Sequence, residues 1–152
     1  MTSPAYDILV TVDERFANEV DPEWIGRIAG RALEGESAPA AELGVLVTGD
    51  ETVRRLNRDY AGEDEPTDVL SFSLQEGEEF AAPDSVLRLG EVIISYPTAQ
   101  RQAQEAGRPV RDELAHLLVH GILHLLGYDH AQPEEERRMR ARERELLEQA
   151  HP

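Results

Sequence analysis

Histidines are concentrated in residues 116–130 (HLLVHGILHLLGYDH), which hold four of the five in the chain. His120 and His124 are four residues apart, so a helix places both side chains on one face, where they reach the same ion. Gly127 is expected to end that helix with a positive φ, and the turn after it brings His130 back toward this face. Three imidazoles with a fourth position open are typical of catalytic zinc. The spacing therefore predicts one zinc ion per chain, bound by His120, His124 and His130 and used for hydrolysis.

His116 continues the same stripe but is expected to stay outside the ligand set. It lies eight residues before His124, about 12 Å along a helix axis, whereas a zinc–nitrogen bond is about 2 Å long. We expect a hydrogen-bonded core histidine at position 116. Two alternatives to the catalytic metal stay open: core histidines satisfied by buried partners, and a structural zinc, although structural zinc usually has four protein ligands. Because affinity order alone does not select zinc, nickel or another divalent ion also fits.

The spacing H-x3-H-x5-H is similar to that of metalloproteases but lacks their general base. Those enzymes carry glutamate directly after the first histidine. Here that position is Gly121. The peptidase interpretation therefore loses its proton acceptor, and the sequence assigns no catalytic residue beyond the metal ligands.

The segments around the histidines predict the elements that hold them. Between Leu114 and Leu126 nearly every residue other than the histidines and Gly121 is apolar, which predicts a buried helix over about 110–126. Strands and helices interleave, with no internal repeat and no long linker. We therefore predict a single α+β domain over residues 1–152, with a roughly four-stranded mixed sheet and about five helices. Strands are expected at 8–12, 42–48, 67–72 and 89–95, and the other helices after Pro22, after Gly49, from Pro97 to about Gly107, and after Pro133. Gly49-Asp50 marks the turn and cap of the second of these helices, whose apolar face includes Val53, Leu56 and Tyr60 and which Gly62 ends.

Composition narrows the function classes. The formal net charge is −16, with 31 acidic residues against 15 basic ones. This argues against a general nucleic-acid coat, which needs a positive surface, but leaves room for a locally basic cleft. Cysteine is absent, so neither disulfides nor thiolate metal sites are possible. Since the sequence offers neither a signal peptide nor a bilayer-spanning stretch, we expect a soluble cytoplasmic protein with no membrane partner and no disulfide-linked partner.

Three segments resemble one known family. Residues 120–130 (HGILHLLGYDH) resemble the signature of the YbeY family, and residues 65–72 (EPTDVLSF) and 90–95 (GEVIIS) are similar to its other landmarks. The resemblance covers roughly Leu43 to Arg138. It implies an α+β fold and carries over all three metal ligands, His120, His124 and His130.

The resemblance also implies a function. Members of the family are zinc-dependent endoribonucleases of the bacterial cytoplasm that act on single-stranded RNA. The implied role is maturation of the 3′ end of small-subunit ribosomal RNA, together with ribosome quality control. The implied partners are ribosomal RNA and ribosomal or assembly proteins.

The chain departs from the family at the end of the second helix. The family commonly has arginine after the tyrosine that closes this helix, where it faces the RNA beside the metal, whereas here alanine follows Tyr60. Arg58 lies three residues before Ala61 and shares its helix face, so it is the candidate substrate-binding residue. The alternative, in which Arg58 pairs with Glu51 or Asp59 and touches no RNA, stays open.

Several other polar residues have two interpretations each. Asp129 either orients an imidazole or moves a proton, or it closes the tight turn before it. Thr67, Asp68 and Ser71 present polar groups to the cleft, or the first two close a turn. The charge-rich segment 134–148 is predicted to be a solvated, ion-paired helix face rather than an RNA site.

We predict a metal-dependent endoribonuclease for ribosomal RNA processing. One rival is a non-catalytic ribosome-assembly factor with a structural metal, which the alanine at position 61 favours. The other is a metal-dependent hydrolase of a peptide or small molecule, which the acidic charge would suit.

Overall fold

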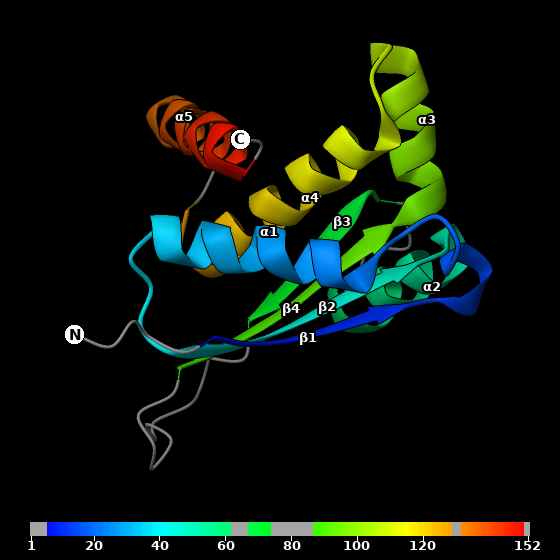
Figure 1. The fold of residues 1–152 in the computed structure, drawn as a ribbon, viewed down its shortest axis with the longest axis horizontal. Helices are drawn as coiled ribbons and strands as arrows, with labels where there is room; N and C mark the ends of the chain where they lie inside the picture. The colour runs from blue at the N-terminus through cyan, green and yellow to red at the C-terminus, as the bar shows by residue number, and fades with distance from the viewer. Residues whose placement is uncertain (1–5, 62–66, 74–86, 129–131, 151–152) are drawn as a thin grey trace.

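A four-stranded sheet, covered by helices, forms the framework of the computed structural model, which describes residues 6–61, 67–73, 87–128 and 132–150 (Figure 1). The strand order is β1-β2-β4-β3. β1 pairs with β2 and β2 with β4 in parallel, and β3 pairs with β4 antiparallel, so the sheet is mixed, as predicted. The strands are β1 (Tyr6–Val12), β2 (Ala41–Thr48), β3 (Val69–Ser73) and β4 (Leu87–Ser95).

The described residues form five α-helices, as predicted. Helices α1 and α4 cover one face of the sheet, α5 lies beyond them, and α2 lies on the other face (Figure 1). A 3₁₀ turn, η1, precedes α1, and a π-helical turn, η2, follows α2. The bounds are η1 (Glu14–Phe16), α1 (Pro22–Gly35), α2 (Asp50–Leu56), η2 (Asn57–Ala61), α3 (Tyr96–Ala106), α4 (Val110–Leu125) and α5 (Pro133–Ala150).

The ends of α1 and α4 follow from local sequence chemistry. Asp21 caps α1 by accepting a hydrogen bond from the backbone N–H of Glu23, and Pro22 occupies the first turn, where its missing N–H costs nothing. At the C-terminal end of α4, Gly127 follows the capping residue Leu126 and adopts φ 105°. The prediction that this glycine ends the histidine helix is therefore confirmed.

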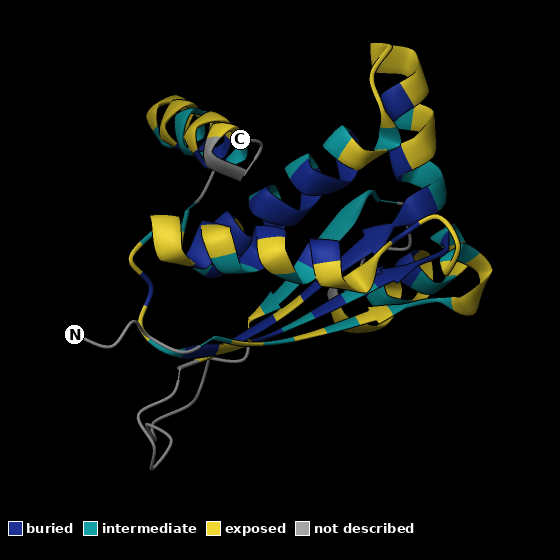
Figure 2. Cartoon of the chain, viewed as in Figure 1, coloured by how far each residue is buried: buried dark blue, intermediate teal, exposed yellow. Residues whose placement is uncertain are grey.

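The core lies between the sheet and the inner sides of α1 and α4 (Figure 2). Alternate residues of β2 and β4 point into it, as a period of two requires. Its largest fully buried side chains include Ile25 and Leu33 of α1, Val92 and Ile94 of β4, and Leu118 and Ile122 of α4. The helix that carries the histidines is thus fixed by apolar packing against the sheet.

The helix after Gly49 differs from its predicted form. A helix continuous to Gly62 was expected, with Tyr60 on its apolar face beside Val53. The structure instead turns π-helical at Asn57, and Tyr60 is 73% exposed. The wider i→i+5 turn shifts later residues away from the face set by a period of 3.6. Gly62 itself lies outside the described residues.

None of the helices in the described ranges is both long and apolar enough to cross a bilayer.

Candidate metal site

Three histidines follow one side of α4. The ring centroids of His116 and His120 lie 6.3 Å apart, and those of His120 and His124 lie 6.1 Å apart. The His116 and His120 side chains are 35% and 28% exposed, and His124 is exposed. The prediction of a helix buried all round therefore needs correction, and His116 is hydrogen-bonded, as predicted, but only partly buried. The apolar side chains of α4 do face the core, but the histidine side is open.

Two of the three predicted metal ligands come together as expected. His120 and His124 stand one helical turn apart with their rings at 77°. The third predicted ligand, His130, lies outside the described residues, as does Asp129. In the ranges that the structure describes, no group of three histidine, aspartate or glutamate side chains is placed to hold an ion. The complete ligand set therefore remains a prediction.

A buried carboxylate from α5 holds two of these imidazoles. His120 Nδ1 lies 2.6 Å from Glu143 Oε1, and His116 Nε2 lies 3.2 Å from Glu143 Oε2. An ionised carboxylate only accepts hydrogen bonds, so each of these ring nitrogens carries the proton. Metal-binding histidines commonly donate one N–H to a carboxylate and coordinate through the other nitrogen. His120, with Nδ1 engaged and Nε2 as the coordinating atom, fits that chemistry.

Electrostatics keep this carboxylate ionised. Burial opposes ionisation of Glu143, but hydrogen bonds from His116 and His120 outweigh it and lower the pKa of the carboxyl to about 2. The hydrogen bond to Glu143 in turn raises the pKa of His116, against the effect of burial. Glu143 is therefore a charged acceptor at neutral pH.

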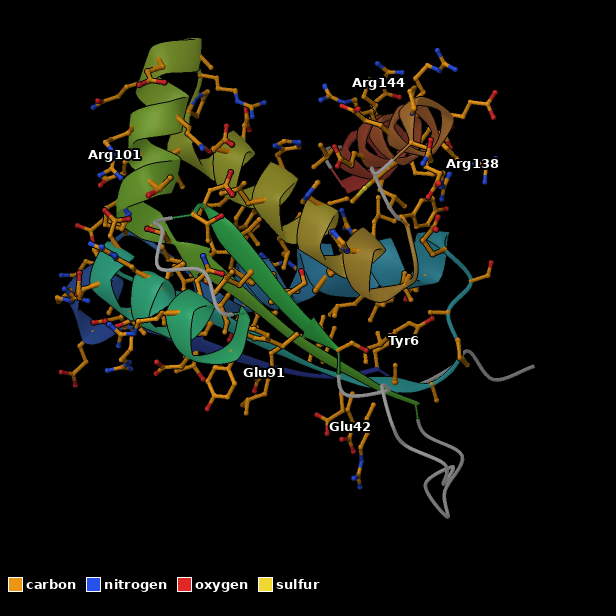
Figure 3. The ribbon with its side chains drawn as sticks, turned by 180° about the vertical axis from the view of Figure 1, so that it is seen from behind. Tyr6, Glu42, Glu91, Arg101, Arg138 and Arg144 are labelled. Atoms are coloured by element: carbon orange, nitrogen blue, oxygen red, sulfur yellow. The ribbon has the colours of Figure 1, made fainter. Side chains whose placement is uncertain are left out.

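Sequence reasoning missed Glu143, because it assigned the whole of 134–148 to a solvated face. Part of that prediction is correct: Glu136 pairs with Arg140 at 2.7 Å, and Arg138 and Arg144 project away from the protein (Figure 3). Glu143 is only 6% exposed, so for this residue the prediction was wrong. The signal was its position on an apolar stripe.

That stripe is visible in the spacing alone. Met139 lies four residues before Glu143 and Leu146 three residues after it, and both are almost fully buried. Residues at these spacings share one helix face. A carboxylate between them must therefore point into the protein.

A small concavity separates α4 from α5 next to this carboxylate. Its volume is about 150 Å³. It is lined by His116, His120, Glu136, Met139, Arg140 and Glu143. The concavity places a water-accessible space beside the histidine stripe.

Gly121 is a point of close approach between α4 and the sheet. A Cβ at this position would lie 2.7 Å from Val92 Cγ1, and the Ser71 hydroxyl donates a hydrogen bond of 3.1 Å to the Gly121 carbonyl. A glutamate therefore cannot occupy the place it has in metalloproteases. This contact gives a physical reason for the departure noted in the sequence.

The polar residues around β3 make structural contacts. Besides the Ser71 bond to α4, the Asp68 carbonyl accepts a hydrogen bond from the Ser95 backbone N–H at 2.9 Å. The Asp68 carboxylate accepts another from Gln102 Nε2 of α3 at 3.2 Å, and Thr67 Oγ1 lies 3.5 Å from the same carboxylate. Asp68 and Ser71 thus join β3 to its neighbours.

Arg58 lies in the η2 turn and is half exposed. Its Nε lies 3.3 Å from the carboxylate of Asp59, which is one of the ion pairs that the sequence left open. Because Arg58 and Ala61 both belong to the π-helical turn, the α-helical spacing that placed them on one face is altered. Next to them, the Tyr60 ring packs edge-on against Phe72 of β3, with centroids 5.6 Å apart.

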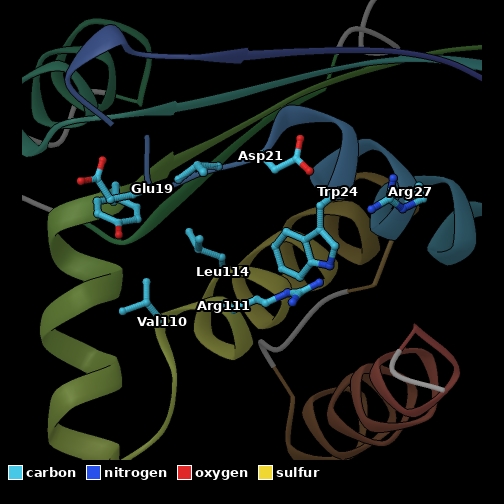
Figure 4. A pocket seen from close by; sticks show the side chains of 9 residues that line it. Glu19, Asp21, Trp24, Arg27, Val110, Arg111 and Leu114 are labelled. Carbon is cyan, nitrogen blue, oxygen red and sulfur yellow. The ribbon is translucent and has the colours of Figure 1, made fainter. Parts of the chain in front are cut away.

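A second pocket, of about 280 Å³, opens on a different side of α4 and contains none of the histidines (Figure 4). The guanidinium of Arg111 lies over the Trp24 ring, 4.7 Å from its centroid. Glu19 and Asp21 bring carboxylates to the same pocket. Within the described residues, its acidic and basic groups form no cluster of metal ligands, so the histidine side is the candidate site.

Fold and site together define an α+β domain whose buried helix presents a histidine stripe backed by a carboxylate. The family described as Endoribonuclease YbeY matches residues 11–151. The chain belongs to this family.

Relatives named Endoribonuclease YbeY match most of the chain. That of Syntrophotalea carbinolica is 45% identical over 142 residues, covering 91% of this chain and 93% of the relative. That of Chloroflexus aurantiacus is 46% identical over 147 residues, covering 93% and 94%. Among solved structures, the solution structure of TM1509 from Thermotoga maritima is similar in fold, with a TM-score of 0.63 at 22% identity, covering 94% of this chain and 88% of that one.

Proposed function

We propose that this chain is a zinc-dependent endoribonuclease that cleaves single-stranded RNA and matures the 3′ end of small-subunit ribosomal RNA, with a part in ribosome quality control. The observation that carries the proposal is the pair His120 and His124, on the open side of α4 and within the histidine block of an endoribonuclease family. Nickel or another divalent ion remains an alternative to zinc.

The residues of the site have different roles in metal binding. His120 and His124 provide two imidazoles from one helical turn, and we assign the third to His130. A bound divalent ion supplies Lewis-acid stabilisation of phosphate charge and a more acidic water. Glu143 accepts the Nδ1 hydrogen of His120 and leaves Nε2 as the coordinating atom.

No side chain is assigned as general base. The close contact of Gly121 with Val92 leaves no room for a carboxylate after the first ligand. We propose that water, rather than the neighbouring 2′-hydroxyl, cleaves the phosphodiester. The products then end in a 5′-phosphate or a 3′-phosphate, and 2′,3′-cyclic ends as the primary product would contradict this version.

Substrate and partners follow from the same proposal. The partners are ribosomal RNA and ribosomal or assembly proteins in the cytoplasm. With a net charge of −16, attraction to RNA phosphates must come from a local group of arginines rather than from the whole surface.

The direct test is cleavage of RNA by metal-loaded protein. A suitable substrate carries the single-stranded 3′ tail of small-subunit ribosomal RNA, and the same sequence annealed to a complementary strand is the control. We expect cleavage of the single strand. In His124→Ala the cleavage rate should fall by more than about 100-fold, because losing a metal ligand costs more than losing a residue that hydrogen-bonds to a ligand. The exposed Glu148→Gln is the matched control and should cleave normally.

A non-catalytic ribosome-assembly factor is the second candidate, favoured by the alanine at position 61. It predicts a protein that binds metal and ribosomal RNA but cleaves neither substrate. Equal cleavage by wild type and His124→Ala would contradict the metal-dependent nuclease and expose a contaminant.

A further inference from the structure

The C-terminal helix reaches the histidine stripe through one buried carboxylate. Glu143 is 6% exposed, and its two oxygens lie 2.6 Å from His120 Nδ1 and 3.2 Å from His116 Nε2. A buried charge is costly unless hydrogen bonds satisfy it. Here imidazoles from α4 serve both oxygens, although most of the other acidic residues of α5 face solvent.

Other contacts fix the position of α5. Met139 and Leu146 bury their side chains on the same helix face as Glu143. On a neighbouring face, Arg142 pairs with Glu36 and donates a hydrogen bond of 3.1 Å to the Gly35 carbonyl, at the end of α1. These contacts hold α5 on two sides without help from Glu143. They therefore fix the position of the Glu143 carboxylate next to α4.

We propose that Glu143 is a positioning residue that fixes the tautomer and ring orientation of His120, so that Nε2 of this ring faces the metal. The inference rests on the proposed function and deepens it by adding a residue of α5 to the metal site. Its physical basis is that the partner of one ring nitrogen determines which nitrogen is available to the metal.

His116 has a supporting part in this arrangement. Its Nε2 donates a hydrogen bond to the second oxygen of Glu143, so each carboxylate oxygen accepts a hydrogen bond from one imidazole. Its Nδ1 is buried, finds no hydrogen-bond partner among the residues that the structure describes, and lies 3.7 Å from a Glu113 oxygen. Loss of His116 removes one of the two hydrogen bonds to Glu143 but leaves the one from His120. It should therefore weaken zinc binding less than loss of Glu143.

Metal affinity is the first readout. Competition with a chromogenic zinc chelator should show that Glu143→Ala weakens zinc binding by about 10- to 100-fold. Glu143→Gln keeps the shape and an accepting oxygen but not the charge, so its loss should be smaller. The exposed Glu148→Gln removes the same charge from the same helix and should bind zinc like wild type, and His116→Ala should fall between that control and Glu143→Ala.

The tautomer of His120 is the second readout and needs no metal. Two-bond ¹H–¹⁵N spectra of the metal-free protein, at a pH where imidazoles are neutral, should show the proton on Nδ1 of His120 in wild type. The proton should move to Nε2 in Glu143→Ala and stay on Nδ1 in Glu148→Gln. A purely structural role for Glu143 predicts no such change.

The outcomes separate this inference from the proposed function. If wild type binds zinc and both Glu143 variants bind it equally well with unchanged tautomers, the inference is wrong and the metal site stands. If wild type binds no divalent ion, the metal site and the inference fail together. Should Glu143→Ala not fold, as judged by circular dichroism, the isosteric Glu143→Gln decides the question by its zinc affinity: binding weaker than that of Glu148→Gln supports the inference, and equal binding overturns it.

Discussion

Helix α4 makes two kinds of contact on its two sides. Toward the sheet, Gly121 lies so close to Val92 that a single added carbon would clash. Toward α5, the imidazoles of His116 and His120 surround the carboxylate of Glu143, beside a concavity of about 150 Å³. The sheet side thus fixes where the helix lies, and the α5 side fixes how its histidines point. Substitutions on the first should cost stability, and substitutions on the second should cost metal binding.

A third junction is a partly buried polar contact built from other residue types. Asp50 begins α2 and accepts hydrogen bonds from Ser95, from Thr98 at 2.7 Å and from Arg101 at 3.1 Å. The sequence suggested the Gly49-Asp50 pair as a turn and cap; in the structure Gly49 is the N-cap, and the Asp50 side chain instead joins α2 to α3. A guanidinium only donates hydrogen bonds, and neither it nor a hydroxyl is among the usual zinc ligands of proteins, whereas imidazole is one.

The largest effect on stability is expected at Gly121. Gly121→Ala places a carbon 2.7 Å from Val92 Cγ1 and should lower the free energy of unfolding by about 1–3 kcal/mol in urea titrations. Gly30→Ala on α1 is the matched control, because its added carbon meets nothing closer than 3.8 Å and should stabilise by up to about 1 kcal/mol. Equal effects at the two positions would show that the contact of α4 with the sheet is looser than described.

A smaller, pH-dependent effect is expected at Asp50. Burial opposes ionisation of this carboxyl, but hydrogen bonds from Ser95, Thr98 and Arg101 outweigh it and lower its pKa below the ordinary 3.8. A lowered pKa contributes stability that is present above the unfolded value and is lost as the pH falls below it. Asp50→Asn should therefore cost about 1 kcal/mol at pH 7, and urea titrations should show this difference shrinking toward pH 3.

The same variant sharpens the contrast between the two polar junctions. Zinc affinity of Asp50→Asn should equal that of wild type, because the partners of the Asp50 carboxylate in the described part of the chain are Ser95, Thr98 and Arg101 rather than a histidine. If Asp50→Asn weakened zinc binding as much as is predicted for Glu143→Ala, loss of either polar contact would disturb the metal site. The Glu143 contact would then have no special role in zinc binding.

The sequence was sufficient where the pattern is local. The helix over about 110–126, its end at Gly127 and the placing of His120 beside His124 all follow from a period of 3.6 and a glycine. Glu143 could not be paired with His120 in this way, because the two are 23 residues apart and only packing of α5 brings them together. Likewise, the spacing of apolar residues does not predict the π-helical turn that exposes Tyr60.

The smallest effect is expected at Arg58, away from α4. As a substitute for the arginine that the family commonly has, it should contribute one phosphate contact. Arg58→Ala should then weaken RNA binding a few-fold and reduce the slope of log affinity against log salt by about 1, with zinc content unchanged. Ala61→Arg should raise cleavage.

These two variants also define the contrary result. If Arg58→Ala binds RNA like wild type while Ala61→Arg strongly increases cleavage, Arg58 is only the ion-pair partner of Asp59. The natural chain would then be a weakened nuclease without a substitute arginine.

The most direct measurement of the central claim is the metal content of gently purified protein. Elemental analysis should find about one divalent ion per chain in wild type and in His116→Ala, and almost none in His120→Ala, His124→Ala or His130→Ala. Because imidazole coordinates only in its neutral form, occupancy should also fall as the pH is lowered. Loss of the ion in His116→Ala, with retention in His130→Ala, would contradict the assignment of the ligands.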